Sequence, residues 1–417
     1  MKVAFVAART PYPCDSGGRI RTYHLLREAA RRHDVTLMTA VESAHDLTSL
    51  HRLRAEIPEL GIRWAAVPPR ASRYRQLLRL GRLPVERLPY TWTAYVTRGF
   101  RDALDRWLAA ERFDLLHCDH VQVADMLLDA PTPPRLLNAH NVESVLARRM
   151  ATRYRGLARA LASWQARKIA AAERRCYRSF ERAAVVSALD GALLTDMVPG
   201  LPFTVVPNGV DAERFAPGDG PPTGRSLVFT GAMDWAPNAD GVAWFVREVL
   251  PRIRRRLGDA SLTVVGRNPA PAMVRALGGH DVRFTGTVDD VRPFLRAASV
   301  VVVPLHAGGG TRLKILEAWS MAKAVVSTSI GAEGLPGADS DALVIADSPD
   351  AFATSVVTLL LDDEHRRRLG LTGRRLIEER FAWPIVGRSL SQAYEATVAA
   401  RHATERSRCA ELPARSR

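Results

Sequence analysis

Short apolar runs rich in β-branched residues recur along almost the whole chain, with stretches of helical spacing between them. These runs are continuous and do not alternate with polar residues, which is typical of parallel strands covered by helices on both faces. Two doubly wound α/β domains account for the pattern most economically. The runs expected to form strands are 2–7, 35–40, 62–67, 114–119, 135–140, 183–187, 226–231, 262–266, 282–286, 300–305, 324–328 and 342–346.

Length and composition agree with two folded domains. A chain of 417 residues exceeds the usual size of one hydrophobic core, and 47% hydrophobic with 25% charged residues is typical of a globular protein. A segment rich in Pro and Gly follows the turn at Asn208-Gly209 and indicates a linker. The predicted organisation is an N-terminal domain (1–208), a linker (209–225), a C-terminal domain (226–383), a helix (384–403) and a flexible tail (404–417).

No apolar run approaches the ~20 residues that cross a bilayer. The first residues resemble a buried strand and lack the pattern of a signal peptide, so we expect a cytoplasmic protein. The four cysteines, at positions 14, 118, 176 and 409, form no CxxC motif and no pattern with His. Neither a disulfide nor a bound metal is therefore predicted.

Positive charge is concentrated in the first half of the chain. The net charge is +15, of which residues 1–200 carry +12 and residues 201–417 carry +3. Two stretches, 51–100 and 141–180, each have ten basic residues against three and two acidic ones. Arg interleaved with aromatic residues and Leu is typical of a surface that lies on anionic lipid, such as the inner face of the cell membrane. A solvated face over ordinary core helices is the alternative.

The stretch HAGGGTRLKILEAW, residues 306–319, follows an expected strand and leads into a helical pattern. Glycines let the backbone approach a ligand, and the first N–H groups of a helix bind anions. Arg312 and Lys314 would add donors for a diphosphate, and Glu317 could accept hydrogen bonds from ribose hydroxyls. A plain glycine turn, with Thr311 as the N-cap, is the alternative interpretation.

Residues 308–335, GGGTRLKILEAWSMAKAVVSTSIGAEGL, closely resemble the donor-site segment of family 4 retaining glycosyltransferases, which have the GT-B fold. Other segments agree in the same order along the chain: 15–37, 140–144, 206–217, 262–269 and 284–305. The resemblance implies two Rossmann-like domains that face each other across a cleft, and a C-terminal helix that crosses back to the N-terminal domain. It also implies transfer of a sugar from a nucleotide diphosphate sugar to a hydroxyl of a glycan or lipid-linked acceptor, in polysaccharide or glycolipid synthesis. No metal or other cofactor is expected.

The donor site departs from the family pattern at two positions. Glu317 corresponds to the second Glu of the family's paired-glutamate motif, but the first Glu is replaced by Gly309. No cation follows Gly231, where many members have an Arg and a Lys directed at the donor phosphates. The predicted donor-binding residues are Gly231, Arg267, Gly308, Gly309, Gly310, Thr311, Arg312, Leu313, Lys314 and Glu317.

Polar residues follow several strands of the first half, at the sheet edge where ligands bind in open α/β folds. The resemblance implies that the loop with Gly17 and Gly18 approaches both the diphosphate and the acceptor, and that His140 meets the transferred sugar. The predicted acceptor-side residues are Gly17, Gly18, Arg21, His117, His120 and Asn141. The predicted catalytic residues are His140, Arg312 and Lys314.

Two other classes of function are open. A nucleotide-sugar epimerase or hydrolase has the same fold and would act without an acceptor. A non-catalytic protein could bind a membrane or nucleic acid through its basic half. The second alternative is disfavoured, because the phosphate-site features lie in the less charged half. No nucleic acid partner is therefore expected.

Overall fold

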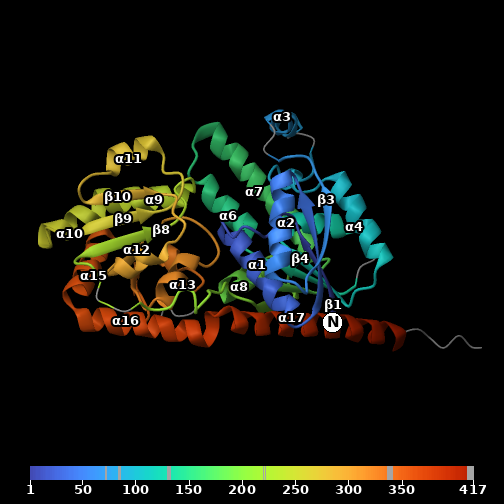
Figure 1. The fold of residues 1–417 in the computed structure, drawn as a ribbon. Helices are drawn as coiled ribbons and strands as arrows, with labels where there is room; N and C mark the ends of the chain where they lie inside the picture. Colours follow the sequence, from blue (N-terminus) through green and yellow to red (C-terminus); the bar gives the residue numbers. More distant parts are fainter. Residues whose placement is uncertain are drawn as a thin grey trace, which may run out of the picture. The chain divides into compact units, whose positions relative to one another are not determined.

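The computed structural model describes residues 1–70, 73–82, 86–128, 133–218, 220, 222–335 and 341–410. The chain divides into two compact units. The first unit consists of residues 1–207 together with the chain from Val386 onward, and the second unit consists of Asn208–Ile385. Figure 1 shows each unit as a sheet with helices packed around it.

The first unit contains a seven-stranded parallel sheet with the strand order β3-β2-β1-β4-β5-β6-β7. Its strands are β1 (Lys2–Ala7), β2 (Asp34–Val41), β3 (Gly61–Ala66), β4 (Leu115–Asp119), β5 (Arg135–Asn138), β6 (Arg182–Val185) and β7 (Phe203–Val205). Its helices are α1 (Gly17–Ala30), α2 (Ala44–Glu56), α3 (Arg73–Gly81), α4 (Arg98–Ala110), α5 (Val121–Ala124), α6 (Glu143–Ala151), α7 (Gly156–Tyr177) and α8 (Ala188–Met197), with 3-10 turns η1 (Trp92–Ala94) and η2 (Asp125–Leu127).

The second unit contains a six-stranded parallel sheet with the order β10-β9-β8-β11-β12-β13. Its strands are β8 (Ser226–Thr230), β9 (Ser261–Val265), β10 (Val282–Gly286), β11 (Val300–Val303), β12 (Ala324–Ser327) and β13 (Val344–Ile345). Its helices are α9 (Ala236–Trp244), α10 (Leu250–Arg256), α11 (Pro271–Leu277), α12 (Arg292–Ala297), α13 (Leu313–Ser320), α14 (Ser329–Ala332), α15 (Pro349–Leu361) and α16 (Asp363–Leu376), with π-helical turns η3 (Phe245–Val249) and η4 (Ile377–Phe381).

Each sheet reverses its strand order once. In the first unit the chain passes from β1 to β2 on one side and later returns to β4 on the other side. In the second unit β8 lies in the same way between β9 and β11. In open α/β folds, ligands bind at the carboxyl ends of the strands that flank such a reversal. This places the candidate site residues of the first unit after β1 and β4, and those of the second after β8 and β11.

The segment predicted as a linker belongs to the second unit. Val210 forms a parallel bridge with Ala382, and its N–H donates to the carbonyl of Phe381 at 2.8 Å. A Cβ atom on Gly209 would come within 2.6 Å of the Trp383 ring, so only glycine allows this close approach. The turn at Asn208-Gly209 is therefore packed into the second unit.

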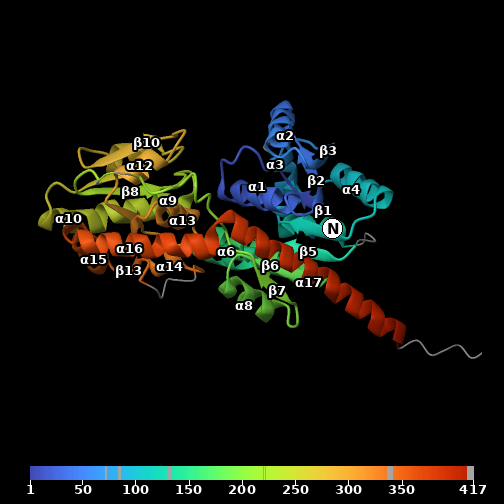
Figure 2. The ribbon, with the colours of Figure 1, turned by 60° about the horizontal axis from the view of Figure 1, so that its bottom comes forward.

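The C-terminal helix α17 runs without interruption from Trp383 to Ala410. From Val386 onward it belongs to the first unit, as the family resemblance implied. Figure 2 shows it as one long helix that runs past the first sheet. Residues 404–410, which were predicted as part of a flexible tail, are helical, and the remainder of that tail, 411–417, lies outside the described residues. Among the described residues, no helix is long and apolar enough to cross a membrane.

Candidate active site

A lysine from α13 lies at the end of β8. The Nζ atom of Lys314 is 3.0 Å from Oδ1 of Asn238 and 3.8 Å from the centre of the Phe229 ring. Gly231, directly after β8, has a φ of 152°, and a Cβ atom there would come within 2.7 Å of Lys314 Nζ. The sequence has no cation after Gly231, but the fold supplies one at the same place from α13.

The glycine loop between β11 and α13 is held by Arg312. The Arg312 guanidinium donates to the carbonyls of Gly309 and Gly310, the latter at 2.9 Å. Gly308 and Gly310 have φ values of 136° and 67°, which glycine adopts at little cost. The guanidinium of Arg312, which was predicted to bind a diphosphate together with the glycine loop, thus donates hydrogen bonds to carbonyls of that loop.

The N-cap residue of α13 is Arg312. The alternative interpretation of this segment had assigned the N-cap to Thr311, and this assignment is wrong. The Thr311 hydroxyl instead accepts a hydrogen bond from Nδ2 of Asn208 at 2.8 Å. Thr311 is buried, so this contact joins the glycine loop to the start of the second unit. The motif around Asn208 therefore supports the glycine loop.

Lys314 and Glu317 lie one turn apart on α13, and both are partly buried. Burial lowers the pKa of Lys314 to about 7, and the charge of Arg312 acts in the same direction. Burial raises the pKa of Glu317 to about 7, although Lys314 and Arg214 oppose the rise. Both groups can consequently gain or lose a proton near neutral pH.

Arg267 lies at the neighbouring strand end and pairs with an acid. Its Nε atom is 3.6 Å from Oδ2 of Asp234, which also accepts from Nδ2 of Asn268 at 2.9 Å. A Cβ atom on Gly266 would be 1.8 Å from the carbonyl oxygen of Gly231, so the loops after β8 and β9 are in close contact. Arg267 therefore belongs to the same sheet edge as Lys314.

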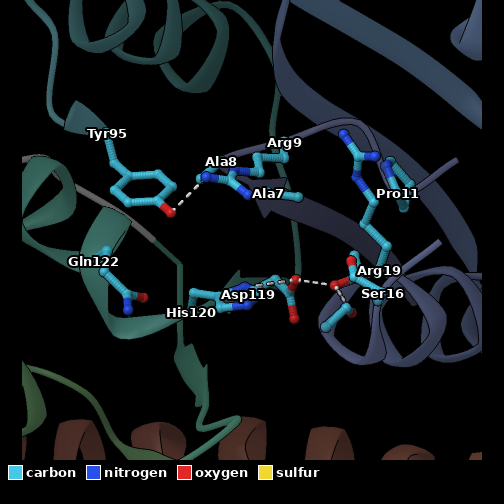
Figure 3. A pocket seen from close by; sticks show the side chains of 12 residues that line it. Ala7, Ala8, Arg9, Pro11, Ser16, Arg19, Tyr95, Asp119, His120 and Gln122 are labelled. Carbon is cyan, nitrogen blue, oxygen red and sulfur yellow. Dashed lines mark hydrogen bonds and ion pairs between the residues drawn. The ribbon is translucent and has the colours of Figure 1, made fainter. Parts of the chain in front are cut away.

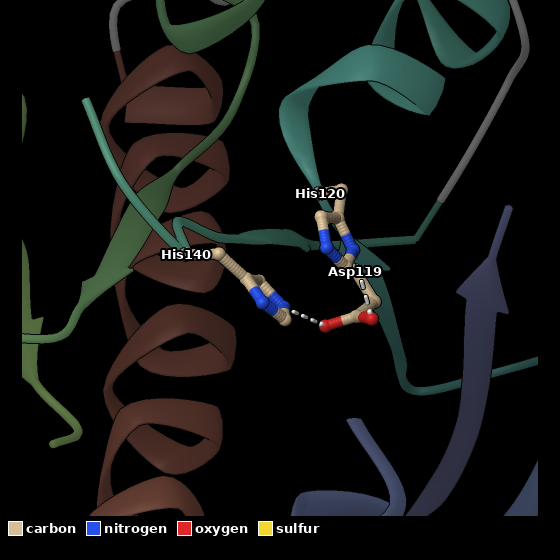
Figure 4. Close-up of side chains that lie close together, drawn as sticks. All are labelled: Asp119, His120 and His140. Atoms are coloured by element: carbon tan, nitrogen blue, oxygen red, sulfur yellow. Dashed lines mark hydrogen bonds and ion pairs between the residues drawn. The ribbon is translucent and has the colours of Figure 1, made fainter. Parts of the chain in front are cut away.

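In the first unit, the fully buried Asp119 ends β4 and accepts four hydrogen bonds. The donors are Thr22 Oγ1 at 2.6 Å, Asn138 Nδ2 at 2.7 Å, His140 Nε2 at 2.9 Å and His120 Nδ1 at 3.1 Å. Figure 4 shows the carboxylate beside the two imidazoles. Asp119 was not among the predicted site residues, although its place at a strand end beside His120 could have identified it.

The rings of His120 and His140 are stacked, with their centres 3.5 Å apart. Burial and the charge of His120 together lower the pKa of His140 to about 3, although the charge of Asp119 opposes the fall. For His120, burial acts to lower the pKa, but the charge of Asp119, the hydrogen bonds to Asp119 and the charge of Glu143 together outweigh burial, and the pKa is raised. His120 is thus the member of the pair that takes up a proton, while His140 stays neutral.

The hydrogen bonds to Asp119 assign the tautomers of both rings. His140 carries its proton on Nε2, which leaves Nδ1 as an acceptor, and His120 donates from Nδ1. A Cβ atom on Gly18 would be 3.7 Å from Nε2 of His120 and 3.9 Å from Nδ1 of His140. The other nitrogen of each ring therefore faces the start of α1, where Gly17 and Gly18 were predicted to approach the ligand.

The atoms that Asp119, His120 and His140 could offer to a metal ion lie within 4.8 Å of one another. However, the Asp119 carboxylate already accepts four hydrogen bonds, and a metal would have to displace some of them. The proton uptake at His120 would also compete with a metal. The geometry is better suited to holding two imidazoles in fixed orientations.

Two predicted acceptor-side residues lie in the interior of the unit. His117 is fully buried, stacks on Phe5 with ring centres 4.0 Å apart, and lies 2.8 Å from the Tyr394 hydroxyl of α17. Arg21 is 1% exposed and donates to the carbonyls of Val206 and Pro207 at 2.8 and 2.9 Å. These side chains connect α1, the sheet and α17, and both are buried in the first unit.

Asn141, the last of the predicted acceptor-side residues, is partly buried at the start of the α6 segment. Its side chain hydrogen-bonds to the Glu143 carboxyl, whose pKa is raised by burial. A second buried acid, Glu173, accepts from the backbone N–H groups of Glu143 and Ser144 at 2.7 and 2.9 Å. Asn141 therefore forms part of the support for the start of α6.

A pocket that is open to solvent lies at the carboxyl ends of β1 and β4. Figure 3 shows Tyr95 and Gln122 on one side, Ser16 and Arg19 on the other, and His120 between them. The residues that line the pocket are Ala7, Ala8, Arg9, Pro11, Ser16, Gly18, Arg19, Thr22, Tyr95, Asp119, His120 and Gln122.

Residues 16–214 match the family model Glycosyltransferase Family 4, and residues 224–362 match the model Glycosyl transferases group 1. A phosphatidyl-myo-inositol mannosyltransferase of Mycolicibacterium smegmatis is 30% identical over 201 residues, 46% of this chain. An MMP alpha-(1->4)-mannosyltransferase of Mycolicibacterium hassiacum is 26% identical over 424 residues, 96% of this chain. A GDP-mannose-dependent alpha-(1-6)-phosphatidylinositol monomannoside mannosyltransferase of Mycobacterium tuberculosis is 26% identical over 49% of this chain.

The chain spans about half the length of two of these relatives, 51% and 58%, and 99% of the Mycolicibacterium hassiacum protein. Among solved structures, sucrose-phosphate synthase from Thermosynechococcus elongatus has a TM-score of 0.69 at 18% identity, covering 96% of this chain and 100% of that chain. WaaG, a glycosyltransferase involved in lipopolysaccharide biosynthesis, has a TM-score of 0.62 at 16% identity, covering 93% of this chain and 98% of that chain. With two parallel-sheet units of the GT-B type and both family models matched in order, the chain belongs to the family 4 glycosyltransferases.

Proposed function

We propose that the protein transfers a sugar from a nucleotide diphosphate sugar to a hydroxyl of a glycan or a lipid-linked acceptor, and that the donor's anomeric configuration is retained. One observation supports this most: the glycine loop, Gly231, Lys314 and Glu317 converge at the ends of β8 and β11. Backbone N–H groups, a cation and a carboxylate are together what a nucleotide diphosphate needs.

In the proposed donor site, Lys314 and the N–H groups at the start of α13 bind the diphosphate. Glu317 accepts hydrogen bonds from the ribose hydroxyls. As the sugar departs, negative charge develops on the leaving diphosphate, and these donors stabilise it. Gly309 stands where the family has its first Glu, so backbone groups of the loop take over contacts to the donor sugar.

In the proposed acceptor half, the two imidazoles have different tasks. Protonated His120 donates from Nε2 to an anionic group, because its Nδ1 atom is held by Asp119. Neutral His140 accepts a hydrogen bond at Nδ1 from a hydroxyl group of the transferred sugar. A departing phosphate oxygen takes the proton of the acceptor hydroxyl, so no further acid–base pair is required.

GDP-mannose is the first donor to test. The three curated relatives described above are all named as mannosyltransferases, and one of them is named as GDP-mannose-dependent. Their names also include phosphatidylinositol-based acceptors. We propose that this chain likewise serves glycolipid or cell-surface polysaccharide synthesis, on the cytoplasmic face of the membrane.

The start of α7 supports peripheral attachment to the membrane. Leu157 is 91% exposed, and Tyr154 and Leu161 beside it are about half exposed. Arg155 and Arg159 are also exposed there. Apolar side chains that stand free among arginines are typical of a segment that enters the interface of an anionic bilayer.

Calorimetric titration with GDP, UDP, ADP and TDP and with their sugars tests the proposal. One nucleotide should bind the wild type and bind Glu317→Ala at least tenfold more weakly, because the ribose contacts are lost. Glu379→Ala, which removes an exposed carboxylate of the same unit, is the matched control and should bind like the wild type. If none of these nucleotides binds, or if Glu317→Ala binds equally well, the proposed donor site is wrong.

Turnover separates transfer from the alternatives of the same fold. With the matching nucleotide sugar, transfer consumes donor only in proportion to a glycosylated acceptor. Release of free sugar without acceptor would indicate a hydrolase, and a changed nucleotide sugar would indicate an epimerase. NMR of the product's anomeric proton reports whether the configuration is retained.

A further inference from the structure

We propose that the pocket of the first unit binds an acceptor that carries a phosphate group, and that Arg9 and Tyr95 hold this phosphate. The inference rests on the proposed function, which assigns the acceptor to this unit. It extends that function by naming the chemical class of the acceptor and the two residues that select it.

Arg9 is an exposed cation in the wall of the pocket, two residues after the end of β1. Its Nη2 atom donates to the Tyr95 hydroxyl at 2.9 Å, and its guanidinium lies 5.2 Å from the centre of the same ring. Within the described part of the chain, no carboxylate lies within ion-pair distance of Arg9. Its charge is therefore available to an anionic ligand.

A second guanidinium contacts Tyr95, but its charge is compensated. Arg70 lies 4.8 Å from the centre of the Tyr95 ring and forms an ion pair with Glu42. The pKa of Arg70 is lowered, mainly by burial, and the charge of Arg9 contributes to the lowering. Two cations therefore lie against Tyr95, and the one carboxylate described there, that of Glu42, is paired with Arg70, which leaves this side of the pocket with an excess positive charge.

The other arginine that lines the pocket, Arg19, forms an ion pair with a nearby carboxylate. Arg19, on the first turn of α1, pairs with Asp15 at 2.9 Å. Figure 3 shows Arg19 on the side of Ser16, away from Tyr95. The excess charge therefore lies at Arg9, and His120 lies between the two sides of the pocket. An acceptor anchored at Arg9 can extend a hydroxyl toward His120 and the start of α1.

Phosphate suits this pair of residues better than a neutral group does. The Tyr95 hydroxyl accepts from Arg9, so its own hydrogen can be donated to a ligand, next to the remaining N–H groups of the guanidinium. A planar guanidinium beside a hydroxyl matches the several acceptor oxygens of a phosphate ester. A soluble sugar phosphate and a phospholipid headgroup share this chemistry.

Paired probes test the inference by calorimetric titration. Glycerol 3-phosphate and glucose 6-phosphate are compared with glycerol and glucose, on the wild type, Arg9→Gln and Arg106→Gln. Arg106 is an exposed arginine of α4 outside the pocket, so its variant controls for the loss of one charge. We expect at least a tenfold preference for the phosphorylated probe, which falls at least fivefold in Arg9→Gln and is kept in Arg106→Gln.

Two further measurements test which unit binds the phosphate and whether the phosphate belongs to a lipid headgroup or to a soluble ester. Lys314→Met removes the proposed diphosphate contact of the second unit, and the preference that depends on Arg9 should persist in it. Vesicles of phosphatidylglycerol, compared with soluble glycerol 3-phosphate, distinguish a lipid headgroup from a free phosphate ester. Tyr95→Phe should lose part of the preference, because it removes the hydroxyl and keeps the ring.

Equal affinity for the phosphorylated and neutral probes, or a preference that survives Arg9→Gln, would overturn the inference. Titration of the same variants with the donor nucleotide keeps this failure apart from failure of the proposed function. If the nucleotide binds but no phosphate preference exists, the inference alone is wrong. If no nucleotide binds while the phosphate preference depends on Arg9, the phosphate site is supported and the proposed transfer is not.

Discussion

Lys314 places a proton equilibrium inside the proposed diphosphate site. Its pKa is lowered to about 7, mainly by burial, so the unliganded protein loses this charge above neutral pH. A diphosphate needs the charged form, and nucleotide binding should therefore take up a proton. Affinity should fall by up to about tenfold per pH unit between pH 7 and 9. Titrations at several pH values, in buffers of different ionisation enthalpy, measure both effects.

Lys314→Met is the control for this effect. The variant should bind the nucleotide more weakly than the wild type at pH 7 and should lose the dependence on pH in this range. Equal wild-type affinity at pH 7 and pH 9 would mean that Lys314 does not contact the diphosphate.

Glu317 should make the free energy of unfolding depend on pH. Burial raises its pKa from 4.5 to about 7. Between these values the folded protein keeps a proton that the unfolded chain has lost, so stability decreases as the pH rises through this window. Glu317→Gln removes the cost and should gain about 1–3 kcal/mol relative to the wild type between pH 4.5 and 8.

Urea unfolding of both proteins at pH 4.5, 6 and 8 measures this relative gain. Glu379→Gln, at an exposed position of the same unit, should show no such trend. A constant free-energy difference between Glu317→Gln and the wild type at all three pH values would contradict a raised pKa of Glu317.

The imidazole groups of His120 and His140 in the first unit should titrate at different pH values. Asp119 raises the pKa of His120 against the effect of burial, whereas burial and His120 lower the pKa of His140 to about 3. NMR of the ring protons should show one resonance that titrates above pH 6.5 and one that does not titrate down to pH 5. His120→Asn and His140→Asn assign the two signals, and two resonances with similar midpoints would contradict the opposite pKa shifts of the two rings.

The sequence predicted where the site residues lie in the fold better than it predicted the direction of their side chains. Gly18, His120 and His140 were expected at one sheet edge, and the structure brings them together. Arg21 and His117 were expected there too, but their side chains turn into the core. The direction of a side chain depends on contacts that are distant in sequence, such as that of His117 with Tyr394, and local patterns carry no information about them.

At the scale of elements, Gly209 carries a close packing contact. A Cβ atom there would lie 2.6 Å from the Trp383 ring and 3.0 Å from the carbonyl oxygen of Phe381. Gly209→Ala should therefore destabilise the protein by about 1–3 kcal/mol, as overpacking does. Gly258→Ala is the matched control, because no atom lies within 4 Å of its added Cβ. Thermal unfolding of both variants checks this, and equal Tm values would mean that the contact relaxes without cost.

The strands were predictable because buried parallel strands are continuous apolar runs, and Val300–Val303 is an example in which all four residues are buried. β7 was missed because it has only three residues, two of them exposed. The linker and the tail were predicted from composition, but Val210 pairs with Ala382 and α17 continues to Ala410. Contacts between segments that are distant in sequence determine the structure of the predicted linker, and composition carries no information about such contacts.

At the scale of the molecule, the excess charge of the first half should be measurable on membranes. The first 200 residues carry +12 of the +15 net charge. We expect co-sedimentation with vesicles that contain phosphatidylglycerol, little with phosphatidylcholine alone, and a decrease as salt rises. Leu157→Asp should weaken the binding at least threefold.

Leu361 provides the control for that experiment, because it is 62% exposed on α15 of the second unit. Leu361→Asp adds the same charge and should leave vesicle binding unchanged. Equal losses in both variants would show that net charge alone, without insertion of the start of α7, accounts for the binding.

The contact between Tyr394 and His117 has a consequence for how the protein is made. Phe5, His117 and the rest of the first sheet leave the ribosome early, but the helix that covers His117 is translated only after the whole second unit. At about 5–20 residues per second, this delay is roughly 10–40 s. During that time most of the second unit is synthesised, while the first unit lacks the contact that Tyr394 makes with His117.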